Sequence, residues 1–543
     1  MTYYNPKIPE KNGEFLCIPS LNLIPQLIKS NKEKFKTYNF TIGYEGFHEF
    51  RKRLREKVIL LSEKFTANLG IKSHLYNNAD TIVQTGHQPI FYHPGIIIKN
   101  LILNKIGMME GINAINLIVD TDNFKEIAVN ILDYRDGIKI EKEILLSNQY
   151  PIPFEFSTPP SQEEFNLFIK GIKNHLSHPQ FKNLHAHFNR YISNISDTQK
   201  NYKTLSEFMT AIRRIYEGEI ESEYLEIPLS YICDTNEFLI FFISIAMKSE
   251  KFTSIYNCQL ERYRKEHKLR YPVNPFPNLT VDGEKTELPF WHFYENKRGR
   301  VFAKSKNDTV VVSFEGGDSI EFNRKKLYNG IDLIKKDNIK IRPKAMILTL
   351  FNRMFVSDAF IHGVGGAKYD RITDNIIRDF YNIEPPQFIT ASLTLYPDII
   401  KGQDKQPPQS PLTKGELQEN IKKLEKKLRD MKYNPERYEA TLKGSPAKDE
   451  GQGGSLAEEK EYLISLLKNN LANKSEISRK IKEINEKIYQ KIKPLTKDIE
   501  DELNILKRQH EQLEIIQRRD YPYFLFSPCD IMKIISSMSQ HGK

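Results

Sequence analysis

The chain has 543 residues, 39% of them hydrophobic, which allows several domains with buried cores and excludes a largely disordered protein. Its 80 Lys and Arg outnumber its 70 Asp and Glu to give a net charge of +10, but no compact basic run accompanies this excess, so we do not expect nucleic-acid binding. Only four cysteines are present, far apart and without a CxxC pair, which excludes a disulfide framework or a zinc ribbon and fits a reducing compartment.

The N-terminal segment lacks a cationic region followed by an apolar stretch, so a signal peptide is not expected. The longest apolar run, residues 238–247, is shorter than the roughly 20 residues that a membrane-spanning helix needs, and we expect it to form a buried helix. The sequence therefore predicts a cytoplasmic protein without a membrane partner. Residues 1–77 are expected to pack on the core that follows.

A β-α-β unit opens the predicted core. Residues 81–85 are β-branched, a Gly/His/Pro turn and an apolar-periodic helix follow, and residues 115–120 form a second strand. This order predicts a parallel strand pair in an α/β core over residues 78–400, with a Rossmann-like sheet. Because ligands of such sheets bind at the carboxyl ends of the strands, the GHQP turn and Asp120 are expected near a binding site.

Two insertions are expected within this core. Residues of about 161–260 have mainly helical apolar spacing, and residues of about 270–325 contain prolines, aromatics and an alternating hairpin pattern typical of a small β element. After them the chain returns to an α/β pattern with a helix, a strand, a Gly-rich turn and another helix.

The pattern changes beyond a polar, Pro-rich linker predicted at 401–415. Residues 416–519 are predicted to form a coiled-coil arm with a flexible loop at 441–455 and a break at Pro494, so that the arm folds back as an antiparallel hairpin. The final segment, 520–543, is aromatic and is expected to dock on the core or on a partner. The apolar positions that recur every three or four residues are Leu417, Ile421, Leu424, Leu428 and Met431, then Ile477, Ile481, Ile484 and Ile488, then Ile499, Leu503 and Leu506.

The turn after the first strand holds the most informative group of polar residues. A helix that begins near Gly95 directs backbone N–H groups and a positive dipole end toward a ligand above the strand, which favours an anion. His87 and His93 are candidate catalytic donors, and Lys99 adds a positive charge one turn into the helix. The alternative is that the two histidines bond loop carbonyls. The residues of this candidate site are Gly86, His87, Gln88, His93, Gly95 and Lys99.

Three carboxylates follow the second strand. Asp120 and Asp122, both candidate catalytic residues, stand at its end, and Glu126 is expected one helical turn onward, so that all three face one crevice. Such a group could bind an amine or ribose hydroxyls, hold a magnesium ion or act as a general base. Helix capping is the equally supported alternative.

A third candidate element is the Gly-rich sequence from His362 to Arg371. Its glycines permit a close backbone approach to a ligand, and two cations follow at the start of a helix, which suggests a second phosphate clamp. The spacing matches neither a Walker A loop nor a GxGxxG fingerprint, and a tight turn with surface charges is the alternative. The ligand-binding candidates here are His362, Gly365, Gly366, Lys368 and Arg371.

Two further groups of residues are weaker candidates for a functional site. Aromatic segments place Glu266, His267, Trp291 and His292 where they could line a substrate pocket, with ordinary packing as the alternative. The four histidines between residues 175 and 187 are irregularly spaced and no cysteine accompanies them, so no metal site is predicted.

Taken together, TGHQPIFYHPGIIIK, DTDNFKEI, HGVGGAKYD and the aromatic end after a coiled coil resemble the bacillithiol-biosynthesis cysteine-adding enzyme family over nearly the whole chain. Gly86 and Gln88 match a TGQQ-type turn of that family, Gly95 and Lys99 match its GP…K helix start, and the segment from Asp120 to Glu126 matches its DHDF-E stretch. His87, Pro89, Thr121 and the HGVGGAKYDR loop depart from the family pattern, and these departures fall at the candidate site.

The resemblance implies a Rossmann-type core related to class I aminoacyl-tRNA synthetases and nucleotidylyltransferases, with a coiled coil that mediates homodimerisation. It implies a carbon–nitrogen ligase that joins cysteine, or another amino acid, to a small carboxyl or sugar-derived acceptor. ATP or ADP is the expected cofactor, with Mg²⁺ where ATP is used, and the partner is a small-molecule substrate. The competing hypothesis is a non-catalytic dimeric nucleotide-binding or scaffold protein that recruits a partner through its coiled coil.

Overall fold

The computed structural model describes residues 6–76, 80–135, 137–196, 202–271, 273, 275–399, 414–439, 455–468 and 473–540. The chain divides into two compact units. The first contains residues 1–133, 140–401 and 519–543, and the second contains residues 134–139 and 402–518. Among the described residues, no helix is both long enough and apolar enough to cross a membrane.

A six-stranded sheet forms the centre of the first unit, in the order β1-β16-β15-β4-β5-β8. All neighbouring pairs are parallel except β1 with β16, which is antiparallel at one edge. The chain therefore builds outward from β4 through β5 to β8, then returns to β15 and β16 on the other side of β4. This confirms the mixed α/β class and a mainly parallel sheet. The strands are β1 (Phe15–Ile18), β4 (Thr81–His87), β5 (Ile112–Ile118), β8 (Leu225–Pro228), β15 (Ala359–His362) and β16 (Ile389–Leu393).

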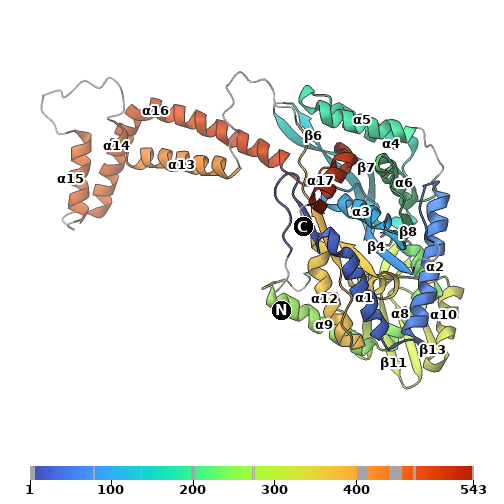
Figure 1. The fold of residues 1–543 in the computed structure, drawn as a ribbon. Coiled ribbons are helices and arrows are strands. Elements are labelled where there is room, and N and C mark those ends of the chain that lie inside the picture. Colours follow the sequence, from blue (N-terminus) through green and yellow to red (C-terminus); the bar gives the residue numbers. More distant parts are fainter. Residues whose placement is uncertain are drawn as a thin grey trace. The chain divides into compact units, whose positions relative to one another are not determined.

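Helices cover both faces of this sheet (Figure 1). Helix α3 (Pro94–Gly107) packs on β4, β5 and β16, whereas α2 (Phe47–Asn68) packs against β8 and α12 (Val364–Tyr381) against β15 and β16. Along β5, Ile115 and Leu117 enter the large apolar core that α2 shares, while Ala114 lies under Gly107 of α3. Alternate side chains of a strand point to opposite faces, so both faces of β5 are buried. Helix α1 (Ile24–Thr37) and the short hairpin β2 (Thr41–Ile42) and β3 (Glu45–Gly46) precede α2.

The predicted helical insertion at about 161–260 is only partly helical in character, because it also supplies β8, a strand of the central sheet. The four residues of β8 are all buried. A run this short shows no hydrophobic periodicity, so the sequence alone does not distinguish it from part of a buried helix. The run at 238–247 forms a buried helix as expected. The helices are α4 (Gln162–His175), α5 (Lys182–Ser196), α6 (Leu205–Glu217), α7 (Leu229–Cys233), α8 (Asn236–Ala246) and α9 (Ser249–Glu266).

A second, antiparallel sheet occupies the region where a small β element was expected, and it extends to residue 343. Its order is β13-β12-β11-β10-β14, with β9 paired to β10. Helices α10 (Leu327–Lys336) and α11 (Ala345–Phe351) flank its last strand along the chain. The strands are β9 (Val281–Asp282), β10 (Lys285–Tyr294), β11 (Lys297–Lys306), β12 (Thr309–Phe314), β13 (Ser319–Asn323) and β14 (Lys340–Pro343).

The segment after β5 is a strand, and not the helix predicted to begin at DTDNFKEI. Strand β6 (Asn123–Tyr134) pairs with β7 (Ile138–Pro153) in a two-stranded hairpin. Ile127, Val129 and Ile131 are buried at every second position, which is strand periodicity, whereas the aspartates before them resemble a helix cap.

The C-terminal segment of the chain belongs to the first unit. The backbone N–H of Tyr523 donates to the Tyr92 carbonyl oxygen at 2.7 Å, and the rings of Phe524 and Tyr191 stack 5.5 Å apart. Tyr521, Tyr523 and Phe524 are buried. The segment is therefore anchored beside the start of α3, and α17 (Pro528–Gln540) completes it.

The second unit is helical. Helix α13 (Lys414–Tyr433) packs antiparallel to the 43-residue α16 (Lys474–Ile516), with ion pairs Lys414–Glu514 and Glu425–Lys507, both at 2.8 Å. Helices α14 (Glu436–Glu439) and α15 (Leu456–Lys468) also contact α16. The predicted break at Pro494 is wrong, because α16 continues through it. Buried residues on both sides, such as Ile492 and Leu503, hold the helix together where the proline removes one backbone donor.

Leu417, Met431, Ile477, Ile484, Ile488 and Leu503 of the predicted apolar seams are buried in this unit. The predicted linker, apart from its last two residues, and the predicted loop at 441–455, apart from Ser455, lie outside the described residues.

Candidate functional site

The carboxyl end of β4 brings together several of the predicted residues. Gly86 and His87 are the last two residues of the strand, and an added Cβ at Gly86 would lie 3.0 Å from the Leu117 carbonyl oxygen of β5. Only glycine fits this close approach without a shift of backbone. The Lys99 ammonium, from the second turn of α3, donates to the Gly86 carbonyl oxygen at 2.8 Å. Gly86, His87 and Lys99 therefore meet at one point, as the sequence predicted.

Lys99 is a buried cation without a carboxylate partner among the described residues. Lys99 is only 4% exposed, and this burial lowers the pKa of its ammonium to about 7. A buried charge is normally paired, because its transfer from water costs several kcal/mol otherwise. Lys99 thus keeps an uncompensated positive charge, or an amine close to half-protonated at neutral pH, at the end of β4.

His93 serves as the N-terminal cap of α3. Its Nδ1 accepts a hydrogen bond from the Gly95 backbone N–H at 3.0 Å, so the ring must be neutral at this nitrogen. Burial and the nearby charges of Arg519 and Lys99 lower the pKa of His93 to about 4, which keeps the acceptor form at neutral pH. His93 therefore caps its own helix by accepting from a backbone N–H, and does not bond a loop carbonyl as the alternative prediction had it.

His87 also remains neutral. Burial, and then the Lys99 charge, lower the pKa of His87 to about 3. Its ring packs edge-on against the buried ring of Tyr92, with centroids 5.2 Å apart. Tyr92 in turn lies beside the Arg213 guanidinium, which is held by Glu217 at 2.9 Å and Glu226 at 2.7 Å. His87 Nδ1 lies 3.4 Å from the Gln88 carbonyl oxygen, the kind of loop contact that was the predicted alternative. The neutral imidazole can exchange a hydrogen bond with a ligand through Nε2, but it carries no charge of its own.

A second cation, Arg519, reaches the start of α3 from the C-terminal segment. Its Nη2 donates to Ser392 Oγ at 3.0 Å and to the Leu393 carbonyl oxygen at 3.1 Å, at the carboxyl end of β16. A Cβ added at Gly95 would lie 3.0 Å from this nitrogen and 2.8 Å from His93 Cε1. Among the described residues Arg519 forms no ion pair, its Nε has no hydrogen-bond partner, and burial lowers its pKa. The missing side chain of Gly95 therefore lets this half-buried, uncompensated guanidinium and the His93 ring lie close to the backbone of the first turn of α3.

Gln88 and Asp122 contact each other on the other side of the turn. Gln88 Nε2 donates to Asp122 Oδ2 at 2.8 Å, and Arg298 of the second sheet donates to Asp122 Oδ1 at 2.9 Å. The same Nη2 of Arg298 donates to the Thr121 carbonyl oxygen at 2.5 Å. Asp122 is thus tied to both the main sheet and the β10–β11 hairpin, with each carboxylate oxygen already accepting one donor.

Asp120 is deeper and separate from Asp122. Its carboxylate accepts from the Ser230 backbone N–H at 2.9 Å and from Ser230 Oγ at 2.5 Å, just past the end of β8. Burial, and then the Glu155 carboxylate, raise the pKa of Asp120. Glu155 itself is held by Arg342 at 2.7 Å. Asp120 is therefore a buried carboxyl that fixes the turn after β8, although a raised pKa also suits a proton carrier.

Glu126 does not join these two aspartates, and the expectation that three carboxylates face one crevice is wrong. It lies on β6 and forms an ion pair with Lys142 of β7. The helical spacing that would have brought Glu126 back toward Asp122 does not exist, because strand β6 carries it away at 3.2–3.4 Å per residue.

The Gly-rich segment after β15 differs from its sequence-based expectation. Gly365 and Gly366 lie in the first turn of α12, which begins at Val364, so the predicted turn is already helix. The register of β15 with β4 places His362 opposite Gly86. Because successive side chains of a strand point to opposite faces, His362 and His87 lie on opposite faces of the sheet. His362 Nε2 instead lies 2.9 Å from Asp370 Oδ2 within α12.

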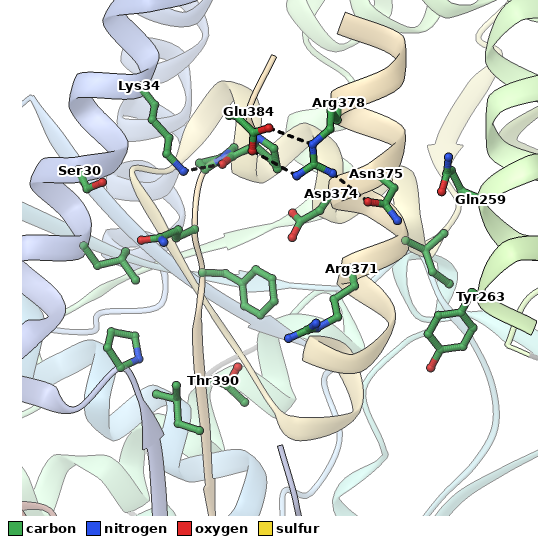
Figure 2. Close-up of a pocket in the computed structure, with 18 of the residues that line it drawn as sticks. Ser30, Lys34, Gln259, Tyr263, Arg371, Asp374, Asn375, Arg378, Glu384 and Thr390 are labelled. Carbon is green, nitrogen blue, oxygen red and sulfur yellow. Dashed lines mark hydrogen bonds and ion pairs between the residues drawn. The ribbon is translucent and has the colours of Figure 1, made fainter. Parts of the chain in front are cut away.

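Arg371 and Lys368 are not brought to the β4 turn. Arg371 lines a cavity of about 850 Å³ between α1, α9, α12 and the segment before β16, a cavity that none of residues 86–99 or 120–126 lines (Figure 2). Lys368 is half-buried on α12 and does not line the cavity. The five residues proposed as a second phosphate clamp therefore do not converge on a single ligand.

Four residues at the β4 turn were missed by the sequence-based reasoning: Ser230, Arg298, Arg342 and Arg519. Arg298 lies within the aromatic segment ELPFWHFYENKRGR, a candidate pocket wall, and Arg519 directly precedes the segment 520–543 that is expected to dock. Their hydrogen-bond partners in this site lie between 126 and 177 residues away along the chain, a distance that no local pattern bridges. The described residues contain no group of three His, Cys, Asp or Glu side chains arranged to hold a metal ion.

Comparison with known proteins adds no relative: no protein-family model matches the chain, and neither does any curated protein sequence.

Proposed function

We propose that the first unit has a Rossmann-like core whose ligand site lies at the carboxyl end of β4. The strand order reverses between β4 and β15, and in open α/β sheets ligands bind outside the carboxyl ends of the strands at such a point. Helices α3 and α12 leave these two strands on opposite faces of the sheet, the arrangement that places a ligand crevice at such a point in open α/β sheets. The observation that carries the proposal is the pair of uncompensated cations, Lys99 and Arg519, beside this point.

The chemistry of these groups fits an anionic ligand. Lys99 offers a buried positive charge, and Arg519 offers a planar donor fork suited to a carboxylate or a phosphate. Gly95, without a side chain, lets this fork lie close to the first turn of α3. In a low-dielectric site these preorganised donors stabilise developing negative charge far more than they would in water. Lys99 and Arg519 would hold the phosphates of ATP or ADP. A Mg²⁺ ion would arrive with ATP, since both oxygens of Asp122 already accept donors.

For the reaction we propose a carbon–nitrogen ligase-like enzyme that joins an amino acid, such as cysteine, to a small carboxyl or sugar-derived acceptor. The resemblance to the cysteine-adding enzyme family supplies this reaction class. The site supports it through the anion-binding half, formed by Lys99 and Arg519, and through Gln88 and Asp122 as polar groups able to position an amine. Neutral His87 would exchange a hydrogen bond with the reacting group without repelling the lysine.

The test is ligand binding by the full chain, measured by calorimetry and by thermal stability with ATP, ADP, inorganic phosphate and amino acids. A ligand that binds only the native state raises the melting temperature by mass action. We expect ATP or ADP to bind, and we expect Arg519→Gln to weaken binding by about tenfold or more, the cost of one charge-assisted contact. Arg518→Gln, the exposed neighbouring arginine, is the matched control and retains parental affinity.

Product formation then separates the enzyme from its competitor. Incubation with ATP, cysteine and an acceptor carboxylate, followed by mass spectrometry, is expected to show an amide product that Lys99→Met abolishes. Nucleotide binding without turnover under any amine and acceptor would favour the scaffold hypothesis. Absence of binding by any anion to a folded protein would contradict the site itself.

We also propose that the second unit is a coiled coil that forms a homodimer. The support is the antiparallel pairing of α13 with the 43-residue α16, and predicted seam positions that stay half-buried in one chain, such as Ile421, Leu424 and Leu428. Light scattering of the full chain, and of a Leu424→Glu, Leu428→Glu variant, gives the mass directly. A monomer in the parent protein would contradict the proposal.

A further inference from the structure

The cavity of about 850 Å³ lies within the size range of small-molecule sites. Its walls come mainly from α1, α9, α12 and the segment at 384–390, all within the first unit. Figure 2 shows Lys34 entering from α1, Asp374 from α12, and Gln259 and Tyr263 from α9. None of the residues in the β4 site lines the cavity, so its ligand is independent of the function proposed above.

The carboxylates that line the cavity are all held by arginines. Each of the three forms an ion pair: Arg262 with Glu266 at 3.0 Å, Arg353 with Asp374 at 2.6 Å, and Arg378 with Glu384 at 3.1 Å. A charged ligand would therefore compete with a partner that each of these carboxylates already has.

The other two cations of the lining, Lys34 and Arg371, are also engaged. The Lys34 ammonium donates to the Pro385 carbonyl oxygen at 3.0 Å. Burial lowers the pKa of Lys34, while the carboxylates of Glu384 and Asp374 act on it in the opposite direction. Arg371 has further interactions within the chain. Because the charges of the cavity are engaged with one another, the cavity favours a neutral ligand over an ion.

One wall of the cavity holds a buried acceptor that lacks a donor. Gln259 is only 6% exposed, its Nε2 donates to Asp379 at 2.6 Å, and its Oε1 has no hydrogen-bond partner among the described residues. A buried acceptor without a donor costs free energy, which a ligand O–H recovers. Figure 2 shows the Asp374 carboxylate, a second acceptor, turned toward the same space from α12.

Hydroxyl groups suit such a lining better than other neutral groups. A hydroxyl both donates and accepts, so it can donate to Gln259 or Asp374 and accept from an N–H of Lys34, whose ammonium carries three donors. Several hydroxyls on one ligand can therefore join the donors and acceptors of different walls without adding net charge.

Two aromatic side chains give the cavity flat apolar surface. Tyr263 on α9 stacks on His267 with ring centroids 4.2 Å apart. Phe388, before β16, lies 4.8 Å from the Arg353 guanidinium and 5.0 Å from the His362 ring, contacts that fix its position. The C–H face of a saturated ring packs against such surfaces and gains from burial of apolar area.

We infer that this cavity is a second ligand site, which binds a neutral cyclic polyol of the monosaccharide class. The hydroxyls of the ligand donate to Gln259 and Asp374, and the face of its ring packs against Tyr263 and Phe388.

The experiment is titration of the full chain, followed by saturation-transfer NMR, with the methyl pyranosides of glucose, galactose and mannose. For the pyranoside that binds best, two matched analogues replace the exocyclic CH₂OH by a carboxylate or by an aminomethyl cation. Tetrahydropyran-2-methanol, which keeps the ring but has a single hydroxyl, is the third comparison ligand. We expect at least one neutral pyranoside to bind, and we expect all three comparison ligands to bind at least about fivefold more weakly.

Three outcomes would overturn the inference. Absence of binding by all three neutral pyranosides would remove the ligand class. Equal or tighter binding of either charged analogue would contradict the engaged charges of the cavity. Equal binding of tetrahydropyran-2-methanol would show that the hydroxyls are not recognised.

Variants then place the ligand. Gln259→Met removes the unpartnered acceptor at similar size and is expected to weaken the pyranoside by about fivefold to tenfold, the contribution of one hydrogen bond. Tyr263→Leu is expected to weaken it several-fold. Gln162→Met and Tyr271→Leu, at exposed positions that do not line the cavity, are the matched controls and keep parental affinity. Melting temperatures confirm that each variant is folded, and parental affinity in both Gln259→Met and Tyr263→Leu would overturn the placement in this cavity.

Discussion

The ends of β4 and β15 make an instructive pair. Each strand ends in a histidine, and each is followed by a glycine-containing helix start with a lysine in its early turns. After β4, Lys99 and Arg519 have no carboxylate partner among the described residues. After β15, His362 lies 2.9 Å from Asp370, and Asp370 also holds Arg353 at 2.5 Å. Similar residue types thus produce an uncompensated positive region on one strand and a neutralised, structural cluster on the next.

The difference shows that charge compensation, and not residue type, separates a candidate binding site from scaffold. A buried ion pair is satisfied by its own protein and offers a ligand little, while an unpaired buried cation is costly for the fold and gains from a ligand. Replacing one residue at each strand end should therefore have opposite consequences: stability falls at β15, and ligand binding falls at β4.

The largest effect is expected at the β15 cluster, from Asp370→Asn. Asp370 is buried and accepts from Arg353 at 2.5 Å and from Thr349 at 2.6 Å. Its loss leaves the buried Arg353 guanidinium with Asp374 as its one carboxylate partner among the described residues, which costs about 3–5 kcal/mol of unfolding free energy. Urea denaturation measures it. Asp332→Asn, an exposed carboxylate on α10, is the control and should stay within about 0.5 kcal/mol.

The same cluster has a pH dependence of known sign. Arg353 and His362 hold the pKa of Asp370 below its ordinary value, so the carboxylate stabilises the fold above the pKa of the unfolded chain, and this contribution is lost as pH falls. Asp370→Asn should therefore flatten the acid side of the stability profile. If the unfolding free energy of Asp370→Asn fell with acid as it does in the parent protein, the Asp370 carboxylate would not contribute to the acid dependence of stability.

At the β4 end the pH dependence runs the other way. The pKa of Lys99 falls from an unfolded value of 10.5 to about 7, so the unfolded state binds more protons between these values and stability rises with pH across that window. The expected contribution between pH 7 and pH 9 is about 2 kcal/mol. Lys99→Met should remove this slope, measured by urea denaturation at several pH values, while Lys57→Met on the exposed face of α2 keeps it. Equal slopes in parent and Lys99→Met would mean that Lys99 is solvated or paired.

Glycine substitutions provide a matched pair at the two helix starts. At Gly95 an added Cβ meets His93 at 2.8 Å and Arg519 at 3.0 Å, whereas at Gly365 nothing lies within 4 Å. Gly95→Ala should disturb the cap and cost about 1 kcal/mol, with a loss of anion affinity. Gly365→Ala should be neutral or stabilise by up to about 1 kcal/mol through helix propensity. Thermal unfolding and anion titration of both variants measure these effects. Equal stability and equal anion affinity of the two variants would contradict the crowding at Gly95.

The sequence predicted the parts of this site that are close together along the chain. The strand, turn and helix from Thr81 to Gly107 have strong, local signals, and Gly86, His87 and Lys99 meet as expected. The predicted position of Glu126 was wrong, because two aspartates followed by a glutamate are compatible with the start of a helix and with the start of a strand. The sequence also failed to predict β8, where four buried residues carry no measurable period.

The partners that decide the charge balance were not predictable. Arg519, which contacts the start of α3, lies 424 residues beyond Gly95 in the sequence. Asp370 lies 2.9 Å from His362 because α12 begins at Val364, almost directly after β15. The motifs in the sequence contain these polar residues but do not indicate which of them form ion pairs in the fold. Whether a buried charge is compensated depends on tertiary contacts, and the pattern of residue types along the chain does not determine those contacts.

The smallest effect on stability, and the sharpest test of the β4 end, is expected from Arg298→Gln. The Arg298–Asp122 pair at 2.9 Å is partly exposed, with side-chain exposures of 20% and 40%, so its loss should change the unfolding free energy by less than about 1 kcal/mol. The same change frees Asp122 Oδ1, adds negative charge beside the proposed anion site and loosens the β10–β11 hairpin from the Asp122 turn. Nucleotide affinity should fall several-fold while stability is nearly unchanged. Arg300→Gln, whose partner Glu315 lies on the second sheet, is the control. If Arg298→Gln lowered stability as strongly as Asp370→Asn, the β4 end would be scaffold like the β15 end.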